Sequence, residues 1–538
     1  MKIYYLIDQT QWQCCNLAGK DYTPAYIPAL AAFMGVTVTP VTKEQLDMLG
    51  TEDILLVGAQ RLAQIPNCRV ILMGTEREQE PCGAVRCKKI FAHYLTKEGK
   101  RLPLFVPVKQ NQIQGEVLAY AQLADGTRIP ALVQGEKCYE FCFDLPATVW
   151  FSGDGFEPTE PSDYFFIGRT PDFRPLLEGE SSAEPFSDLL IGELEKILKN
   201  LGVPMLYRLP PDEEGNVPDL VLHFSGDDDC TSADYNLQAA LRMESYGFLY
   251  HINAMPMAGQ YFVFDKDAYE NMQAHGCELA LHLDFTGGVS YSAESIQAQS
   301  QLYEACFGIR PYTNTNHCLI QGGSTAERMR WLAEAGIAAD NGKLGEFDPA
   351  DINAFDLCGF GYGTSFPRYT CDDCQHGNVL LSTMEIPITY YEPRLYEEDS
   401  DTSRITDYLD NGAAWGRITQ FFIHPHYLHD TSEDLEATKR VLELIGSHCE
   451  RMGYRKLIST TDRIAAFWQG RKQASIQREN SEIVVDSQIP VVLVLPAGYL
   501  QKEAVCVDGK PAAVISRKIG GEQMHLVALE AGTHRIHP

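Results

Sequence analysis

Three consecutive aspartates, Asp227, Asp228 and Asp229, form the densest group of potentially reactive side chains in the chain. They follow the apolar residues 220–224 and two small residues, a pattern typical of a buried strand that ends at the edge of a sheet. Neighbouring carboxylates repel one another at the short distances that the backbone imposes. The run is therefore expected beside a bound cation or in contact with water, and we favour a divalent metal ion.

Four histidines come at the ends of other strand-like runs in the same region: His282, His317, His424 and His426. Zn²⁺ accepts imidazole nitrogen and carboxylate oxygen together, and a catalytic site uses about three protein ligands and leaves a position for water. The ion lowers the pKa of that water, and a second carboxylate accepts its proton. Each residue taken alone is more often structural, but their recurrence at strand ends favours a hydrolytic metal centre.

Strand-like and helical patterns alternate through residues 218–471 and would position these side chains. Apolar runs predict strands at residues 220–224, 278–282, 384–389 and 417–424. Amphipathic patterns predict helices at residues 233–246, 266–274, 293–306, 324–335 and 432–452. Parallel strands with helical crossovers over ~250 residues predict a closed or nearly closed β/α barrel, whose strands present reactive side chains at their carboxyl ends.

The pattern changes on both sides of this region and predicts three domains. Residues 1–200 alternate strands and helices and then turn to hairpins, which predicts an α/β domain with added antiparallel strands. Residues 201–475 contain the predicted barrel. Residues 476–538 carry short alternating strands and predict a small β-sandwich-like tail.

The charge balance excludes some partners. The 538 residues carry a formal net charge of −29, which argues against nucleic acid and anionic membranes, because both attract basic surfaces. No apolar run approaches the ~18 residues that a membrane span needs, and the first residues lack the apolar segment of a signal peptide. We expect a cytoplasmic protein whose 16 cysteines are mostly reduced.

The order of four short segments carries a resemblance to a known family. SGDD at 225–228, GCELALH at 276–282, RPY at 310–312 and IH at 423–424 resemble the motifs of polysaccharide deacetylases of the carbohydrate esterase 4 type. The resemblance implies a distorted (β/α)₇ barrel. It also implies a metal-dependent enzyme that removes acetyl groups from N- or O-acetylated sugars.

The resemblance also implies roles for five residues. Asp227 corresponds to the general base, Asp228 and His282 to metal ligands, Arg310 to the residue that orients the base, and His424 to the general acid. The implied cofactor is a divalent metal ion, with zinc first and cobalt, manganese or nickel as alternatives.

Two residues depart from the usual family pattern. The family has a further histidine four residues after His282, where this chain has Thr286, and a glycine after the aspartate pair, where this chain has Asp229. A divergent branch of the family is similar at 316–319 (NHCL), 359–364 (GFGYGT), 385–387 (EIP) and 468–471 (WQGR). Gly361 stands where that branch has an arginine.

The divergent branch suggests a third metal ligand. On this resemblance we nominate His317 as the third ligand and keep Asp284 in reserve. Asp284, Tyr312 and His426 are further candidates for contact with a substrate. Trp415 is a candidate for lining a sugar groove, although packing in the core is at least as good an explanation for a tryptophan.

The N-terminal region carries a looser resemblance. Residues 115–145 resemble the late strands of glutamine-amidotransferase-like domains. Those enzymes need a cysteine on a sharp turn between a strand and a helix, and the chain has no Gly-x-Cys-x-Gly. We therefore predict a non-catalytic domain that packs or mediates homo-oligomerisation.

Three functions remain open on the sequence. The first is a metal-dependent deacetylase of an acetylated saccharide that cleaves C–N or ester bonds and not peptide bonds. The second is a catalytically impaired carbohydrate-binding protein of the same fold, which Thr286, Asp229 and Gly361 would suit. The third is a metal-dependent hydrolase of a non-sugar amide or of a glycosidic bond.

Overall fold

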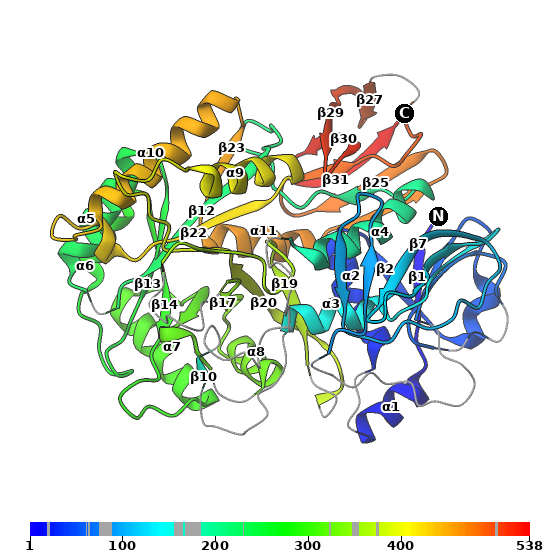
Figure 1. The fold of residues 1–538 in the computed structure, drawn as a ribbon, viewed down its shortest axis with the longest axis horizontal. Helices are drawn as coiled ribbons and strands as arrows, with labels where there is room; N and C mark the ends of the chain where they lie inside the picture. Colours follow the sequence, from blue (N-terminus) through cyan, green and yellow to red (C-terminus); the bar gives the residue numbers. More distant parts are fainter. Residues whose placement is uncertain are drawn as a thin grey trace.

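A curled sheet of mainly parallel strands forms the middle of the chain (Figure 1). The structure is a computed structural model that describes residues 1–18, 22–60, 62, 65–74, 89–154, 165–166, 184–229, 231–321, 324–346, 355–372, 376–500 and 504–538. Neighbouring parallel strands of this sheet are, in spatial order, β22 (Ile418–Phe422), β12 (Leu220–Asp227), β13 (Tyr250–Ala254), β14 (Cys277–Leu283), β15 (Thr313–Asn316), β17 (Ala339–Leu344) and β20 (Leu380–Ile388).

The two ends of the central sheet carry short antiparallel additions. β19 (Arg368–Cys371) pairs with β20, and β18 (Leu357–Cys358) pairs with β21 (Tyr390–Tyr391), which lies beside β22. β23 (Lys456–Ser459) pairs with the first half of β12. Among the described residues the strand pairing runs from β18 to β19 without closing. The sheet is therefore a curled half-barrel, and a complete (β/α)₇ barrel stays a prediction.

Helices follow most of the parallel strands, as the sequence predicts. They are α5 (Ala233–Ser245), α6 (Lys266–Gln273), α7 (Ala293–Phe307), α8 (Thr325–Glu334), α9 (Ser403–Trp415), α10 (Leu435–Met452) and α11 (Thr461–Gln473). Asp265, Ser292 and Thr460 cap three of them by accepting a hydrogen bond from a backbone N–H of the first turn. Every residue of β12 is buried, as expected for a parallel strand covered on both faces.

The N-terminal region contains a second sheet with two kinds of pairing. Its spatial order is β2 (Val38–Val41), β1 (Ile3–Leu6), β3 (Ile54–Val57), β4 (Arg69–Met73), β9 (Cys138–Phe141), β8 (Arg128–Gln134), β7 (Glu116–Leu123), β5 (Ala92–Leu95) and β6 (Arg101–Leu104). The strands from β2 to β9 are parallel, and those from β9 to β6 are antiparallel. This mixed sheet agrees with the predicted α/β region with added antiparallel strands.

The C-terminal segment forms two small antiparallel sheets. One contains β24 (Ser475–Glu479), β25 (Glu482–Ser487), β31 (Gly532–His537), β27 (Ala504–Val507) and β28 (Lys510–Ala513). The other contains β11 (Met205–Leu206), β26 (Val491–Val494), β30 (Glu522–Leu529) and β29 (Ile515–Ile519). One hydrophobic cluster includes residues of both sheets, and the β-sandwich-like architecture of the tail stays a prediction.

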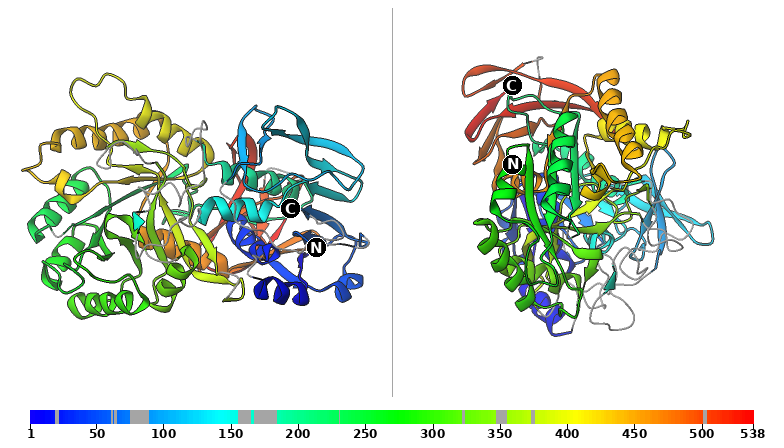
Figure 2. Two further views of the ribbon diagram at one scale, coloured as in Figure 1. Left: turned by 60° about the horizontal axis from the view of Figure 1, so that its bottom comes forward. Right: turned by 90° about the vertical axis from the view of Figure 1, so that its left-hand side faces the viewer.

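The three regions pack against one another. α2 (Ile27–Met34) and α4 (Phe186–Asn200) belong to a large hydrophobic cluster that also contains Val221 of the central sheet and Val492 of the tail. The amino group of Met1 donates a hydrogen bond to the carbonyl oxygen of Arg478, 2.8 Å away, and Figure 2 shows the N-terminus beside the C-terminal strands. The domain boundaries at 200 and 475 stay predictions. No helix within the described ranges is long and apolar enough to cross a membrane.

Candidate metal-binding active site

The acids and histidines singled out in the sequence meet at one edge of the central sheet. Asp227 is the last residue of β12, His282 lies near the end of β14, and His317 and His424 follow β15 and β22. Because these strands are parallel and lie close together in the sheet, their carboxyl ends share one edge. Asp229 follows β12 with a φ of +43°, and this backbone turn brings its side chain back over the edge.

The ligand atoms lie within a few ångströms of one another. The Nε2 atom of His282 is 3.3 Å from Asp227 Oδ2 and 3.4 Å from Asp229 Oδ1. The Nε2 atoms of His317 and His424 are 3.8 Å and 3.5 Å from the Asp229 carboxylate. Two groups of atoms within 4.8 Å result: Asp229, His282 and His317, and Asp227, Asp229 and His424. Asp229 belongs to both groups.

The surroundings of the His282 imidazole favour a bound cation at this edge of the sheet. Its Nδ1 atom lies 3.0 Å from the carbonyl oxygen of Thr315, so Nδ1 carries a proton and donates it. Its Nε2 atom is buried and has no hydrogen-bond partner within the described part of the chain, yet it faces two carboxylates. A lone pair aimed at two anions is unfavourable, and either a proton or a metal ion on Nε2 relieves it. One carboxylate with two imidazoles is a donor set that suits Zn²⁺.

His317 is held by a hydrogen-bonded carboxylate. Its Nδ1 atom lies 3.1 Å from Asp284 Oδ1, which also accepts hydrogen bonds from the backbone N–H and the hydroxyl of Thr286, at 2.8 and 2.7 Å. Burial alone would raise the pKa of Asp284, but the hydrogen bonds from His317 and Thr286 lower it to about 2. Against the effect of burial, Asp284 and Asp229 help to raise the pKa of His317 to about 11. Asp284 therefore orients a ligand and is itself occupied by other contacts.

Glu392 holds His424, and the sequence analysis did not identify it. Its Oε1 atom accepts hydrogen bonds from the backbone N–H of His424, at 2.9 Å, and from Nδ1 of the same residue. The other oxygen lies 3.0 Å from Nη2 of Arg394. Burial favours the neutral imidazole, but Asp229 and Glu392 raise the pKa of His424 to about 10. The only signal in the sequence is an acid that follows the strand-like run at residues 384–389.

Asp227 and Asp229 belong to the two groups of close ligand atoms, together with the histidines. Asp227 is 5% exposed, and its Oδ1 atom accepts a hydrogen bond of 2.8 Å from Asn253. Burial raises the pKa of Asp227, although His282 and His424 oppose the shift. Asp228, expected as a metal ligand, accepts a hydrogen bond of 2.9 Å from the backbone N–H of Met255 and belongs to neither group of ligand atoms.

Two further predicted residues lie away from this edge. The side chain of Arg310 is 82% exposed, and its Nε atom lies 3.1 Å from the carboxylate of Glu304 instead of contacting Asp227. Tyr312 packs against the large hydrophobic cluster. Both residues precede β15, whereas His317 follows it. They therefore lie at the amino end of the strand, and this position corrects the expectation that they contact the base or the substrate.

His426 lies on the same side of the sheet as the candidate site. It is exposed on the short 3₁₀ helix Pro425–Leu428 that follows His424. Its ring stacks on Tyr235 with a centroid distance of 5.9 Å and lies 5.3 Å from the ring of Tyr427. The exposed His426 and the two partly buried tyrosines form an aromatic surface beside the site, and the contact of His426 with a substrate stays a prediction.

Comparison with known proteins finds distant likenesses only. No model of a known protein family matches the chain, and no curated protein matches it. Among solved structures, a putative polysaccharide deacetylase from Mycobacterium smegmatis is 13% identical, with a TM-score of 0.33, and the match covers 51% of this chain and 99% of that one. A putative glycoside hydrolase/deacetylase from Parabacteroides distasonis is 10% identical, with a TM-score of 0.33 and coverage of 57% and 90%.

A third similar structure contains a metal ion. It is a family 4 acetyl xylan esterase from Clostridium thermocellum in complex with a cobalt ion, 11% identical, with a TM-score of 0.26 and coverage of 46% and 91%. TM-scores of this size identify neither the family nor the activity of this chain. The resemblance of the N-terminal region to glutamine-amidotransferase-like domains also stays a prediction.

Proposed function

We propose that the chain is a metal-dependent hydrolase that removes acetyl groups from an acetylated carbohydrate, at an amide or ester bond and not at a peptide bond. One observation carries this proposal: the buried Nε2 atom of His282 faces the carboxylates of Asp227 and Asp229. The site thus has one carboxylate to hold an ion and a second to accept a proton. The segments at 225–228, 276–282 and 423–424, which resemble motifs of polysaccharide deacetylases and lie at the site, support an acetylated sugar as the substrate.

Asp229, His282 and His317 would hold the metal ion. Their ligand atoms form one of the two close groups, and Thr315 and Asp284 fix the orientations of the two imidazoles. This ligand set replaces Asp228 by Asp229. Zinc is the first choice for one carboxylate and two imidazoles, and cobalt, manganese or nickel also suit nitrogen and oxygen donors. When bound, the ion lowers the pKa of a coordinated water and polarises the acetyl carbonyl.

Asp227 would act as the general base. Its carboxylate lies next to His282, and the hydrogen bond from Asn253 leaves Oδ2 directed toward the site. Because burial raises the pKa of Asp227, the carboxylate is a stronger proton acceptor than an exposed aspartate. It would take the proton from the attacking water.

His424 would act as the general acid, and it faces the Asp229 oxygen other than the one that lies near His282 and His317. Its Nε2 atom points to the Asp229 carboxylate at 3.5 Å, and Glu392 holds Nδ1. With its pKa raised to about 10, the imidazole carries a proton at neutral pH and can donate it to the leaving amine or alkoxide. The base and the acid are therefore separate residues with different environments.

The structure gives two of the three unusual residues a part in this site. Thr286 donates two hydrogen bonds to Asp284, which holds His317. Asp229 belongs to both groups of potential ligands. These contacts favour an active enzyme over the catalytically impaired binding protein, because they give two of the three residues on which that alternative depended, Thr286 and Asp229 but not Gly361, a place beside the proposed ligands.

Metal content and acetate release test the proposal together. The full chain, purified without chelators, should contain about one divalent ion, and it should release acetate from N-acetylated or O-acetylated oligosaccharides. A chelator should abolish the release, and zinc or cobalt should restore it. Release of new reducing ends without acetate would instead support the glycosidic-bond alternative. Absence of both products, with no metal bound even in excess zinc, would refute the proposal.

A further inference from the structure

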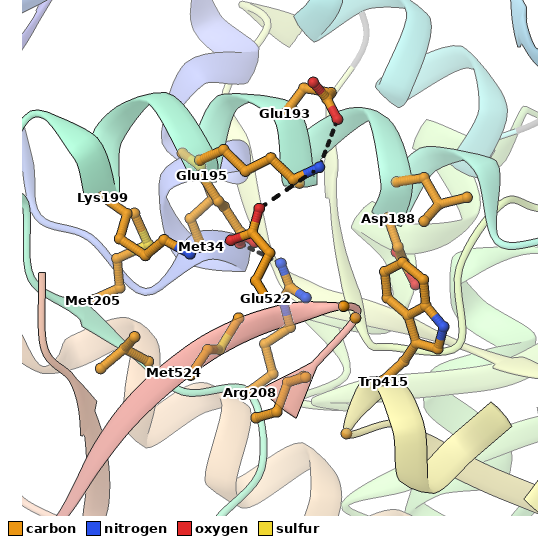
Figure 3. A pocket seen from close by; sticks show the side chains of 18 of the residues that line it. Met34, Asp188, Glu193, Glu195, Lys199, Met205, Arg208, Trp415, Glu522 and Met524 are labelled. Atoms are coloured by element: carbon orange, nitrogen blue, oxygen red, sulfur yellow. Dashed lines mark hydrogen bonds and ion pairs between the residues drawn. The ribbon is translucent and has the colours of Figure 1, made fainter. Parts of the chain in front are cut away.

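A cavity lies where the three predicted domains meet, far from the candidate metal site. Its volume is about 280 Å³, close to the lower end of the ~300–1,000 Å³ of small-molecule sites. Its walls come from the end of α2, from α4, from the residues before β22 and from the β29–β30 hairpin. Figure 3 shows the side chains that line it.

The cavity and the metal site are at opposite ends of the same strand. Arg417 lines the cavity just before β22, and His424 follows β22 at the carboxyl edge. Seven residues of extended chain span roughly 20 Å. A ligand in the cavity would therefore not contact the proposed catalytic residues.

One part of the lining is apolar and adaptable. Met34, Met205 and Met524 come from three different regions of the chain and line the same cavity. Trp415, the last residue of α9, lies at the other end of the cavity in Figure 3. Methionine side chains adjust to irregular shapes, and a tryptophan ring offers a flat surface. These walls suit a ligand with an aromatic or aliphatic body.

The charged part of the lining is balanced. Five cationic and five acidic side chains line the cavity, and several form ion pairs with one another. Lys196 lies 2.9 Å from Glu193, Lys199 pairs with Glu522, and Arg208 pairs with Glu195. A ligand with a net charge would find no complementary excess of the opposite charge, which favours a neutral one.

Two guanidinium groups, that of the buried Arg417 and that of the partly buried Arg208, have nitrogen atoms without a hydrogen-bond partner among the described residues. Arg417 is 3% exposed, and its Nη1 atom donates to Asn411, but its Nη2 atom has no hydrogen-bond partner among the residues that the structure describes. The buried Nε atom of Arg208 also has none within that part of the chain. Unsatisfied buried donors are unfavourable, and a small rotation of either side chain toward the cavity would let an oxygen of a ligand satisfy them.

Asp188 restricts what that ligand can be. It is 7% exposed, lines the cavity, and interacts electrostatically with both arginines. A carboxylate ligand would be repelled by Asp188 and Glu522, and an ammonium ligand would leave the arginine donors unsatisfied. A hydroxyl or amide group accepts from an arginine and donates to a carboxylate, so it suits all of these groups.

We propose that this cavity is a binding site for a small neutral amphipathic molecule. Its apolar body packs against the methionines and Trp415, and its hydroxyl or amide group bonds to Arg208, Arg417 and Asp188. This site is independent of the proposed deacetylase activity, because none of its residues belongs to the metal site.

Four probes of similar size test the class of ligand by ligand-observed NMR on the full chain with a chelator present. They are 2-phenylethanol, phenylacetate, 2-phenylethylammonium and glucose. The first three differ mainly in charge, and glucose lacks the apolar body. We expect 2-phenylethanol to bind at least tenfold more tightly than each of the others. Failure of 2-phenylethanol to bind, or a preference for another probe, would overturn the proposal.

Gly192 on α4 supplies a matched pair of variants that locates the binding. It lines the cavity, and a Cβ built at this position has no atom within 4 Å. Gly192→Met should fill the cavity and abolish binding of 2-phenylethanol, whereas Gly192→Ala should retain it. Both changes favour the helix, so both variants should fold, which their thermal unfolding would verify. Retained binding in a folded Gly192→Met variant would place the ligand elsewhere and refute the site.

Discussion

The imidazole of His424 is hydrogen-bonded through Nδ1 to the buried carboxylate of Glu392. Glu392 is 1% exposed and has a φ of +46°. The same carboxylate oxygen accepts the backbone N–H of His424, so both the ring and the backbone of the histidine are held. With Nδ1 engaged, Nε2 points to Asp229. The pair therefore fixes the tautomer of His424 and the direction in which it can transfer a proton.

Replacement of Glu392 by glutamine should change the pH dependence of catalysis. Against the effect of burial, Glu392 is one of the three carboxylates, with Asp229 and Asp227, that raise the pKa of His424 to about 10, and its loss should lower that pKa. The protonated acid is then lost at a lower pH, so the alkaline limb of the kcat profile should move toward neutrality. A fall in kcat of about 10- to 100-fold is expected at the optimum.

The pH–rate profile of Glu392→Gln tests this expectation, and a variant of an exposed glutamate serves as the control. Glu397 has a side chain that is 88% exposed, so Glu397→Gln should leave the profile unchanged. If Glu392→Gln lowered kcat without moving the alkaline limb, Glu392 would have only a structural role.

The neighbouring aspartates Asp228 and Asp229 should differ in their effect on metal binding. Asp229→Asn removes a charge that faces three imidazoles, and its zinc affinity should fall by more than the ~10- to 100-fold typical of outer-shell partners. Asp228→Asn should bind zinc normally, because the amide oxygen can still accept from Met255. Titration with a competing chelator measures both. Equal losses of zinc affinity in the two variants would indicate that Asp228 is also a metal ligand.

The sequence predicted the residues whose positions depend only on where strands end. Asp227, His282, His317 and His424 come at or just after apolar runs, and parallel strands bring such residues to one edge. The sequence could not show that the Asp229 carboxylate lies beside three histidines, because Asp229 follows the strand with a positive φ.

Other parts of the site depended on the path of the chain between strands. Arg310 and Tyr312 fit a motif, but they precede β15 and so lie at its amino end. Glu392 was missed because a turn with a positive φ directs it toward His424. The alternation of strands and helices predicted the central sheet. It did not predict that the sheet stays open, because the antiparallel strands β18 and β19 at its two ends have no periodic pattern of their own.

Zinc binding should release protons from the site. Asp284 and Asp229 help to raise the pKa of His317 to about 11, although burial opposes the shift. The free imidazole is therefore protonated at pH 7.5, whereas a metal ligand must be neutral. Calorimetry of zinc binding in buffers of different ionisation enthalpy should show about one proton released per ion. On binding zinc, the His317→Ala variant should release fewer protons than the Asp228→Asn variant. Equal release by the two variants would show that His317 is not a metal ligand.

Two histidines inside the central sheet should make the protein less stable in mild acid. His223 and His251 are fully buried, and their Nε2 atoms lie 2.9 Å and 3.4 Å from the hydroxyls of Thr461 and Thr313. Burial lowers the pKa of both, most strongly for His223. In the unfolded chain they titrate near pH 6.5. As the pH falls below that value, the unfolded state takes up protons that the folded state excludes, so the free energy of unfolding decreases.

His223→Gln isolates this effect, because glutamine can keep the hydrogen bond to Thr461 without titrating. Urea unfolding in the presence of a chelator should show that the wild type loses more stability between pH 6.5 and pH 5 than the variant does. One excluded proton changes the free energy of unfolding by about 1.4 kcal/mol per pH unit, which sets the upper limit of the difference. His525→Gln, at a histidine on an exposed hairpin beside Ser516, should keep the wild-type slope. Parallel curves for the wild type and His223→Gln would mean that His223 can take up a proton within the folded sheet, and the low pKa would then be wrong.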